Sequence, residues 1–237
     1  MNDIAIFGFK DSSAGQLINM LDGKLKKRLN CIFSFLKLHD IDINKEHAKR
    51  PNNKTEFLIN NKIFGLPVFD DKKNFIKILK ARKIKHVFIM EGQGYVRNII
   101  SKIIKKEKLN ILSYIHKSVK LMGQNSIGEG VILFPNSYIG YKSDIGDGCI
   151  IQSGCIIDHH NSIGNFCNIN PRMTTGGFTK IGNYCEINMS VEIIDKIKIG
   201  NYSRVGAGSL VLKDIGNNEL QYGRPSKFIK KNNYKDR

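Results

Sequence analysis

An aliphatic residue recurs at every sixth position between residues 115 and 211, and this period constrains the fold more than any other feature of the chain. Of these seventeen positions only Thr175 is not aliphatic; the others are Ile115, Leu121, Ile127, Leu133, Ile139, Ile145, Ile151, Ile157, Ile163, Ile169, Ile181, Ile187, Ile193, Ile199, Val205 and Val211. The period matches neither an α-helix nor a simple strand. Hexapeptide repeats of this kind build a parallel β-helix, in which each repeat forms one side of a coil.

Small or slender side chains recur four residues after most of these positions, among them Cys149, Cys155, Cys167 and Cys185. Three sides of six residues make a coil of eighteen, so residues eighteen apart should stack about 4.8 Å apart along the axis. We therefore expect Cys149, Cys167 and Cys185 to lie on one another. Glycine often follows the aliphatic residue directly, and we expect it to permit a tight corner there.

Length limits the number of domains, and charge indicates the class of partner. The 237 residues are enough for two modest domains, and 38 basic against 21 acidic residues give a net charge of +17. This balance suits a polyanionic partner such as a nucleotide-linked sugar or coenzyme A. No zinc-finger or RNA-binding signature is present, so we expect no nucleic-acid partner.

The cysteine pattern and the absence of apolar targeting segments indicate a compartment. The chain has no CxxC motif, so we expect no zinc and interpret the cysteines as reduced core thiols. It has neither a signal peptide nor an apolar run of membrane-spanning length. We therefore predict a cytoplasmic protein without a membrane span.

The first 110 residues lack the six-residue period and alternate between strand and helix patterns. A helix carrying Leu17, Ile18 and Leu21 should be capped by Ser12 or Ser13 and closed by Gly23. The other expected elements are strands at 4–8, 31–35 and 87–90, helices at 75–79 and 95–108, and a loop at 39–62. This alternation predicts a small α/β unit with a parallel sheet.

Several stretches resemble the bacterial sugar O/N-acyltransferases, which pair a short Rossmann-like domain with a hexapeptide coil. The resemblance rests on Ile4–Gly8, residues 63–68, Arg97, residues 115–119, Val205–Val211 and residues 223–227. It implies an α/β Rossmann-like N-terminal domain at 1–110, a left-handed parallel β-helix at 111–220 and a basic tail at 221–237. The left-handedness comes from the resemblance and not from the spacing.

The same resemblance implies an activity. Such enzymes transfer an acetyl group from acetyl-CoA to the amino group of a nucleotide-linked amino sugar, without a metal. They are homotrimers in which two subunits share each site. The expectation for this chain is therefore an acetyl-CoA-dependent N-acetyltransferase.

The adjacent pair His159 and His160 is the candidate centre. His159 falls on the family's histidine and would take a proton as the amine attacks the thioester, since imidazole titrates near working pH. His160 stands where the family has an acidic residue, and we assign it to substrate binding. Asp158 or an acid from another chain could replace the missing carboxylate, the base could be tuned differently, or His159 could only position the amine. Because neighbours on a strand point to opposite sides, we expect one histidine in the site and one exposed.

Gly177 follows His159 by one coil, and in the family a glycine here donates its amide to the thioester oxygen. Thr175, the break in the aliphatic row, would mark the active-site side. For acetyl-CoA the resemblance points to Asn168, Gly206, Ala207, Gly208, Arg224 and Lys227. For the nucleotide of the sugar it points to Gly8, Lys10, Ser12 and Ser13.

Three other functions remain open from the sequence. An O-acetyltransferase acting on a sialic-acid-like sugar would use the same fold and depend more on its base. A γ-type carbonic anhydrase shares the coil but needs three zinc-binding histidines spread over it. A non-catalytic scaffold or anion binder would not bind acetyl-CoA.

Overall fold

The computed structural model describes residues 2–8, 11–34, 62–71 and 73–232, with the side chains of residues 11 and 12 left aside. The chain forms two compact units. The N-terminal unit comprises Met1–Gly92, Ile100–Ile111 and Lys235–Arg237, and the coil unit comprises Gln93–Ile99 and Leu112–Tyr234.

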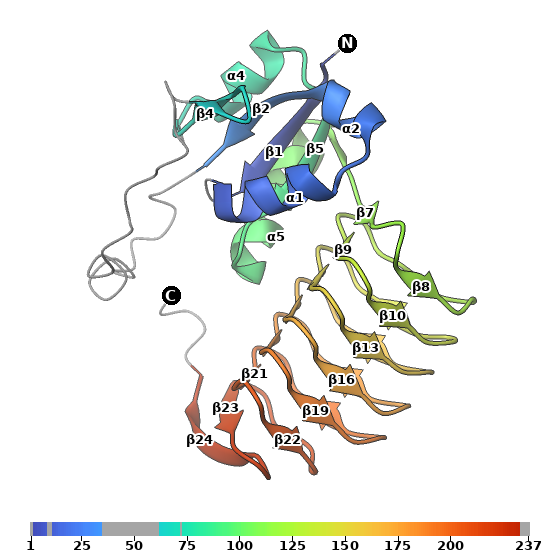
Figure 1. Cartoon of the computed structure of the whole chain (residues 1–237). Coiled ribbons are helices and arrows are strands. Elements are labelled where there is room, and N and C mark those ends of the chain that lie inside the picture. The colour runs from blue at the N-terminus through green and yellow to red at the C-terminus, as the bar shows by residue number, and fades with distance from the viewer. Residues whose placement is uncertain (1, 9–10, 35–61, 72, 233–237) are drawn as a thin grey trace. The chain divides into compact units, whose positions relative to one another are not determined.

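The N-terminal unit is built on a six-stranded sheet in the order β3-β4-β2-β1-β5-β6 (Figure 1). All neighbours are parallel except β3 and β4. The strands are β1 (Ile4–Gly8), β2 (Leu29–Phe33), β3 (Lys62–Ile63), β4 (Leu66–Phe69), β5 (His86–Met90) and β6 (Asn110–Ile111). The chain leaves β1 toward β2 on one side and β5 lies on the other, so the sheet order reverses at β1, as in Rossmann-like folds.

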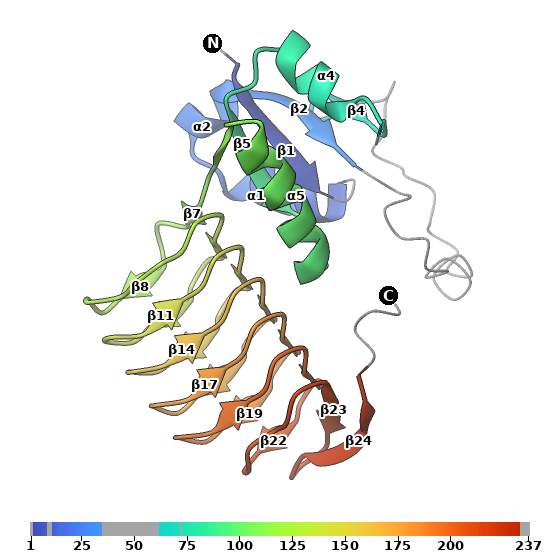
Figure 2. The same cartoon turned by 180° about the vertical axis from the view of Figure 1, so that it is seen from behind.

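Helices cover both faces of this sheet. The two views show α1 and α2 on one face and α4 and α5 on the other (Figures 1 and 2). The helical segments are a π-helical turn η1 (Asp11–Gly15), α1 (Gln16–Met20), α2 (Gly23–Arg28), α4 (Phe75–Ala81) and α5 (Gly94–Lys106). The predicted strands and helices of this region therefore exist, with shifted ends. Of the expected loop at 39–62, residues 39–61 lie outside the described residues.

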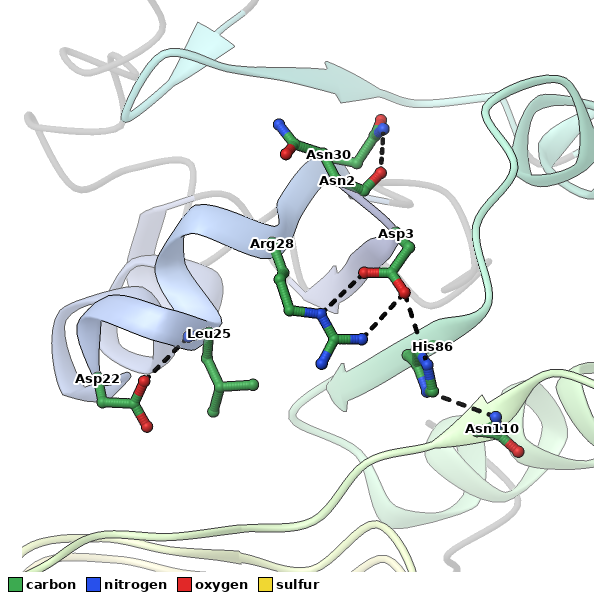
Figure 3. Close-up of polar contacts among 8 residues, drawn as sticks. All are labelled: Asn2, Asp3, Asp22, Leu25, Arg28, Asn30, His86 and Asn110. Atoms are coloured by element: carbon green, nitrogen blue, oxygen red, sulfur yellow. Dashed lines mark hydrogen bonds and ion pairs between the residues drawn. The ribbon is translucent and has the colours of Figure 1, made fainter.

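Two local predictions for this unit were wrong, and one pair of strands was not predicted. Gly23 does not close a helix but begins α2, because the Asp22 carboxylate accepts hydrogen bonds from the Lys24 amide at 2.8 Å and from the Leu25 amide at 2.9 Å. Figure 3 draws the second of these bonds. Ser13 lies inside η1, so it does not cap a helix, and α1 has no side-chain cap. The hairpin of β3 and β4 was not anticipated, since its strands have two and four residues.

A polar cluster joins the start of β1 to the end of α2 (Figure 3). The Arg28 guanidinium donates two hydrogen bonds to the Asp3 carboxylate, both at 2.9 Å, and His86 Nε2 lies 3.6 Å from that carboxylate. The Arg28 hydrogen bond holds the pKa of Asp3 below its usual value. A carboxyl group with a lowered pKa stabilises the folded state above its unfolded pKa of about 4 and loses that effect as the pH falls through its folded pKa.

Replacing Asp3 with Asn should therefore destabilise the N-terminal unit at pH 7, and the difference from the parent protein should shrink below about pH 4. Arg28→Gln should cause the same loss, and the double variant should add little, because both changes remove one pair. Chemical unfolding as a function of pH measures this. A difference that stays constant down to pH 2 would contradict it.

The coil unit is a prism with three parallel-stranded sides, and Figure 1 shows the coils stacked along its axis. Side A holds β8 (Lys120–Leu121), β10 (Tyr138–Ile139), β13 (Ile156–Ile157), β16 (Thr174–Thr175), β19 (Glu192–Ile193) and β22 (Leu210–Val211). Side B holds β11 (Asp144–Ile145), β14 (Ser162–Ile163), β17 (Lys180–Ile181) and β20 (Lys198–Ile199). Side C holds β7 (Tyr114–Ile115), β9 (Ile132–Leu133), β12 (Ile150–Ile151), β15 (Asn168–Ile169), β18 (Glu186–Ile187), β21 (Arg204–Val205), β23 (Glu219–Tyr222) and β24 (Lys227–Lys231).

The eighteen-residue register is observed directly. Ile139 pairs with Ile157, and Ile157 pairs with Thr175. The aliphatic row is buried from Leu133 to Val211 and forms one continuous core. The prediction that the six-residue period builds a β-helix is confirmed.

The cysteines of the inward row stack as predicted. The Cys167 amide donates to the Cys149 sulfur, and the Cys185 amide donates to the Cys167 sulfur, each at 3.4 Å. All five cysteines of the chain are free and buried. Burial raises the pKa of the Cys155 thiol to about 11.

The glycines that follow the aliphatic positions were predicted to permit a tight corner, and this reason was wrong. The left-handed residue of each turn comes three residues after the aliphatic position, and it is His160, Phe166 or Phe178 as readily as glycine. Glycine is required at Gly140 because a Cβ there would lie 2.5 Å from the Asp158 carbonyl carbon of the next coil. It permits close stacking of the coils, not an unusual backbone angle.

The described residues after 220 are more ordered than a tail. Strand β24 pairs antiparallel with β23, and β23 continues side C parallel to β21. Residues 221–232, expected as part of a basic tail, thus form the last turn of the coil unit. All five residues of β24 are exposed.

Candidate active site

The two histidines lie on a turn at the corner between sides A and B, where His160 has φ of +55°. The expectation that one faces the site and the other points away was wrong, because strand alternation does not apply to a turn. The two Nδ1 atoms lie 3.0 Å apart, and the ring planes are nearly perpendicular at 86°. Both side chains are half-buried and act as one unit.

Gly177 lies directly against the His159 ring, one coil further along. A Cβ at Gly177 would lie 2.5 Å from His159 Cε1 and 2.8 Å from Nε2. Contacts this short show that the imidazole occupies the space that any other residue's side chain would need. The structure thus brings together the two residues that the resemblance named as base and amide donor.

The amide of Gly177 is free to donate. At the corresponding position of another corner, the amides of Asp147, Asn165 and Asn183 each donate to the side chain of the residue eighteen positions later, at 2.7–2.8 Å. Among the described residues, the Gly177 amide donates to none. Since Gly177 is buried, an acceptor that reached this N–H would satisfy a group whose isolation costs about 1–3 kcal/mol.

A buried polar network supports this corner from inside. The Asn161 side chain donates to Thr175 Oγ1 at 2.6 Å, to the Asp158 carbonyl at 2.9 Å and to the Gly176 carbonyl at 3.1 Å. Its oxygen accepts from the Thr179 amide. Thr175 points into the coil and is 3% exposed, so it does not face a substrate. The break in the aliphatic row lies at the corner that carries His159, because the Thr175 hydroxyl anchors that turn.

Asp158 does not orient the imidazole within this chain. Its carboxylate accepts from the His159 backbone amide at 2.7 Å, and the Nδ1 partner of the His159 ring is His160. Of the two substitutes considered for the missing acid, Asp158 is therefore not the one used in a single chain.

Phe178 is a residue of this corner that the sequence reasoning did not single out. Its ring stacks on His160 with centroids 4.8 Å apart and planes 13° apart. Tyr141 meets His160 edge-on at 5.8 Å. The same eighteen-residue step that leads from His159 to Gly177 leads from His160 to Phe178, so the signal was present.

The expected acetyl-CoA residues do not all lie at this corner. Asn168 lies on side C, away from His159. Gly206, Ala207 and Gly208 form the turn between β21 and β22, at the corner of sides C and A. Arg224 joins that turn, since it donates to the Gly208 carbonyl at 3.3 Å, but its charge is paired with Glu192 at 3.0 Å. Lys227 is exposed on β24.

The residues expected to hold the nucleotide lie in the N-terminal unit. Gly8 ends β1, and a Cβ there would lie 3.1 Å from Ser13 Oγ and 3.3 Å from the Ala14 amide nitrogen. Gly8 and Ser13 are thus brought together at the carboxyl end of the central strand. Lys10 lies outside the described residues, as does the side chain of Ser12.

Arg97, one of the residues that carried the resemblance, has a structural position in the coil unit. It is 1% exposed, and its guanidinium donates to the carbonyls of Gly148, Phe166 and Cys167 at 2.8, 3.2 and 3.1 Å. It binds the coil backbone and not a candidate ligand site.

No group of three or more His, Cys, Asp or Glu side chains in the described ranges is arranged to hold a metal ion. None of the described helices is long and apolar enough to cross a membrane.

Known proteins share the sequence repeat of the coil. Residues 126–159 and 178–213 match the bacterial transferase hexapeptide family, with six repeats. Over these residues the coil has the hexapeptide repeats of that family. No curated protein sequence matches the chain.

Solved structures share the fold over the whole chain. PerB of Caulobacter crescentus, in complex with CoA and GDP-perosamine, is 21% identical with a TM-score of 0.79, covering 97% of this chain and 98% of that one. The acetyltransferase domain of PglB from Neisseria gonorrhoeae, also solved with acetyl-CoA, is 16% identical. Its TM-score is 0.76 without acetyl-CoA, with 97% and 100% covered. The predicted fold class is confirmed: an α/β N-terminal unit followed by a left-handed parallel β-helix.

Replacing Thr175 with Val would complete the aliphatic row, yet it should destabilise the coil by about 1–2 kcal/mol, because the Asp158 amide loses its acceptor and Asn161 Nδ2 loses one of its three acceptors. Thr174→Val, which changes the outward-facing neighbour, is the matched control and should have little effect. Urea unfolding measures both. A Thr175→Val protein as stable as the parent would show that the network does not hold this corner.

Proposed function

We propose that this protein is an acetyl-CoA-dependent N-acetyltransferase acting on the amino group of a nucleotide-linked amino sugar. The observation that carries the proposal is the His159 imidazole packed against Gly177, whose amide has no acceptor among the described residues. A proton acceptor and an N–H donor on adjacent coils are what direct attack of an amine on a thioester requires. One removes the proton of the nucleophile, and the other stabilises the developing oxyanion.

The reaction needs no covalent enzyme intermediate. The amine nitrogen attacks the thioester carbon, the carbonyl oxygen gains negative charge against the Gly177 amide, and the C–S bond then breaks to release the CoA thiolate. His159 Nε2 takes the proton that the amine loses. The fold shared with PerB and with the PglB domain, which were solved with CoA or acetyl-CoA, supports this donor.

The nucleotide of the sugar is proposed to bind at the carboxyl end of β1. The strand order reverses at β1, and ligands of open α/β sheets bind outside the carboxyl ends of strands at such a point. Gly8 and Ser13 meet there, and Lys10 and Ser12 follow Gly8 in the sequence. Lys10 would neutralise phosphate, while the serines would donate hydrogen bonds. The solved PerB complex contains GDP-perosamine, which is a ligand of this class.

A homotrimer would complete the site. His159 lies at the corner of sides A and B, whereas Asn168 lies on side C, so one chain does not bring them to one acetyl-CoA. A partner coil packed alongside could place its Asn168 near His159. Asparagine can hydrogen-bond the amides of the pantetheine arm.

Mass spectrometry of a panel of nucleotide amino sugars, incubated with protein and acetyl-CoA, tests the activity. One acetyl group should be added to an amine, and His159→Asn should lower kcat/KM by about 10²–10³-fold. Gly177→Ala should cost about 10²-fold, because its Cβ displaces the imidazole. His116→Asn, which changes a partly buried histidine that follows β7 on side C, is the control. Transfer only to a hydroxyl would replace the proposal by the O-acetyltransferase.

Subunit mixing tests the shared site. Neither His159→Asn nor Asn168→Ala homo-oligomers should be fully active, but mixed assemblies should regain part of the activity, because some sites pair two unmodified residues. Light scattering should give three times the mass of the chain. A monomer with full activity would contradict the trimer while leaving the chemistry intact.

A further inference from the structure

We propose that His160 is a positioning residue for the reaction. Its Nδ1 accepts a hydrogen bond from the Nδ1–H of His159 and thereby keeps His159 Nε2 unprotonated and facing the substrate. This inference rests on the proposed function, because it assigns the direction of the hydrogen bond from the role of His159 as the base.

The 3.0 Å distance between the Nδ1 atoms of His159 and His160 requires one hydrogen between them. At 3.0 Å, two bare nitrogens would repel and two N–H groups would clash, so one Nδ1 carries hydrogen and the other does not. The two neutral imidazoles therefore hold opposite tautomers. Either His159 carries hydrogen on Nδ1 and His160 on Nε2, or the reverse.

Only the first arrangement makes His159 the base. With hydrogen on His159 Nδ1, the lone pair of Nε2 is free on the ring edge that lies against Gly177. In the reverse arrangement Nε2 carries the hydrogen and cannot accept a proton. His160 thus does by hydrogen bonding what an acidic partner does by hydrogen bonding and charge.

The ring of His160 is itself held in place. Phe178 stacks on one face, and Tyr141 meets the ring edge-on, with its hydroxyl donating to Gln124 at 3.0 Å. The Phe178 amide donates to the His159 carbonyl at 3.0 Å, which ties the stacking ring to the histidine turn. The acceptor nitrogen is therefore fixed by packing against two neighbouring coils.

Protons balance in this arrangement. When the amine gives its proton to His159 Nε2, His159 becomes an imidazolium that still donates from Nδ1 to the neutral His160. The positive charge then lies on His159, and it is discharged when Nε2 releases the proton to the leaving thiolate or to water. His160 neither gains nor loses a proton.

Two substitutions separate the hydrogen bond from the packing. His160→Phe keeps an aromatic ring to stack on Phe178 but removes the acceptor, whereas His160→Asn keeps an acceptor oxygen near the position of Nδ1. Both residue types already occupy this position of the repeat with left-handed backbones, at Phe166 with φ of +56° and Asn136 with φ of +61°. Both variants should therefore fold, and thermal unfolding confirms this.

Nitrogen-15 NMR of the imidazoles reads the tautomers directly and does not depend on activity. In the parent protein His159 should be protonated on Nδ1 and His160 on Nε2. His160→Asn should keep His159 on Nδ1, and His160→Phe should shift it toward Nε2. With an accepted amine, His160→Phe should lower kcat about tenfold or more with little change in the KM for acetyl-CoA, and His160→Asn should recover most of it.

The outcomes separate the two proposals. A parent protein with His159 protonated on Nε2, or a His160→Phe variant with unchanged tautomer and kcat, would overturn the role of His160. If no amine of the panel is acetylated, the proposed function fails. The NMR measurement then still decides whether His160 accepts from His159.

Discussion

Backbone pairing between residues eighteen apart is the constraint on which the rest of the coil depends. Each coil is held to the next through such pairs, for example Ile157 with Thr175. Because the sides are flat and the register does not slip, a side chain on one coil has a defined neighbour on the next. His159 meets Gly177, and His160 meets Phe178, for this reason alone. The candidate site is therefore a property of the repeat, built at one corner where the repeat residues change type.

The chemistry of that corner depends on two departures from the repeat. Inside, Asn161 and Thr175 replace apolar residues and bind the carbonyls and amides of the turn. Outside, the Gly177 amide lacks the side-chain acceptor from the next coil that the equivalent amides have at another corner, so it stays unused. Polar groups buried in a hydrophobic prism are tolerated only when they are paired, and here the pairing fixes the backbone that carries the histidines.

Much of this arrangement could be predicted from residue spacing in the sequence. The coil, the stacked cysteines and the meeting of His159 with Gly177 all come from one spacing of eighteen. Features that depend on tertiary packing could not be predicted from the sequence. The turn that places both histidines on one side requires a left-handed residue at His160, and no local signal marks it. Gly140 and its equivalents look like corner glycines, but they are needed because the next coil passes within the reach of a Cβ. The helix start at Gly23 was missed because Asp22 was not recognised as its cap.

The central claim is that one thioester lies between His159 and the Gly177 amide. A crystal structure of the protein with acetyl-CoA, or with a non-hydrolysable analogue, tests this most directly. The account predicts the thioester carbonyl oxygen within hydrogen-bond distance, about 3 Å, of the Gly177 nitrogen, with His159 Nε2 facing the path of the amine. An acetyl group bound at another corner, or a Gly177 amide that points away from the thioester, would contradict it.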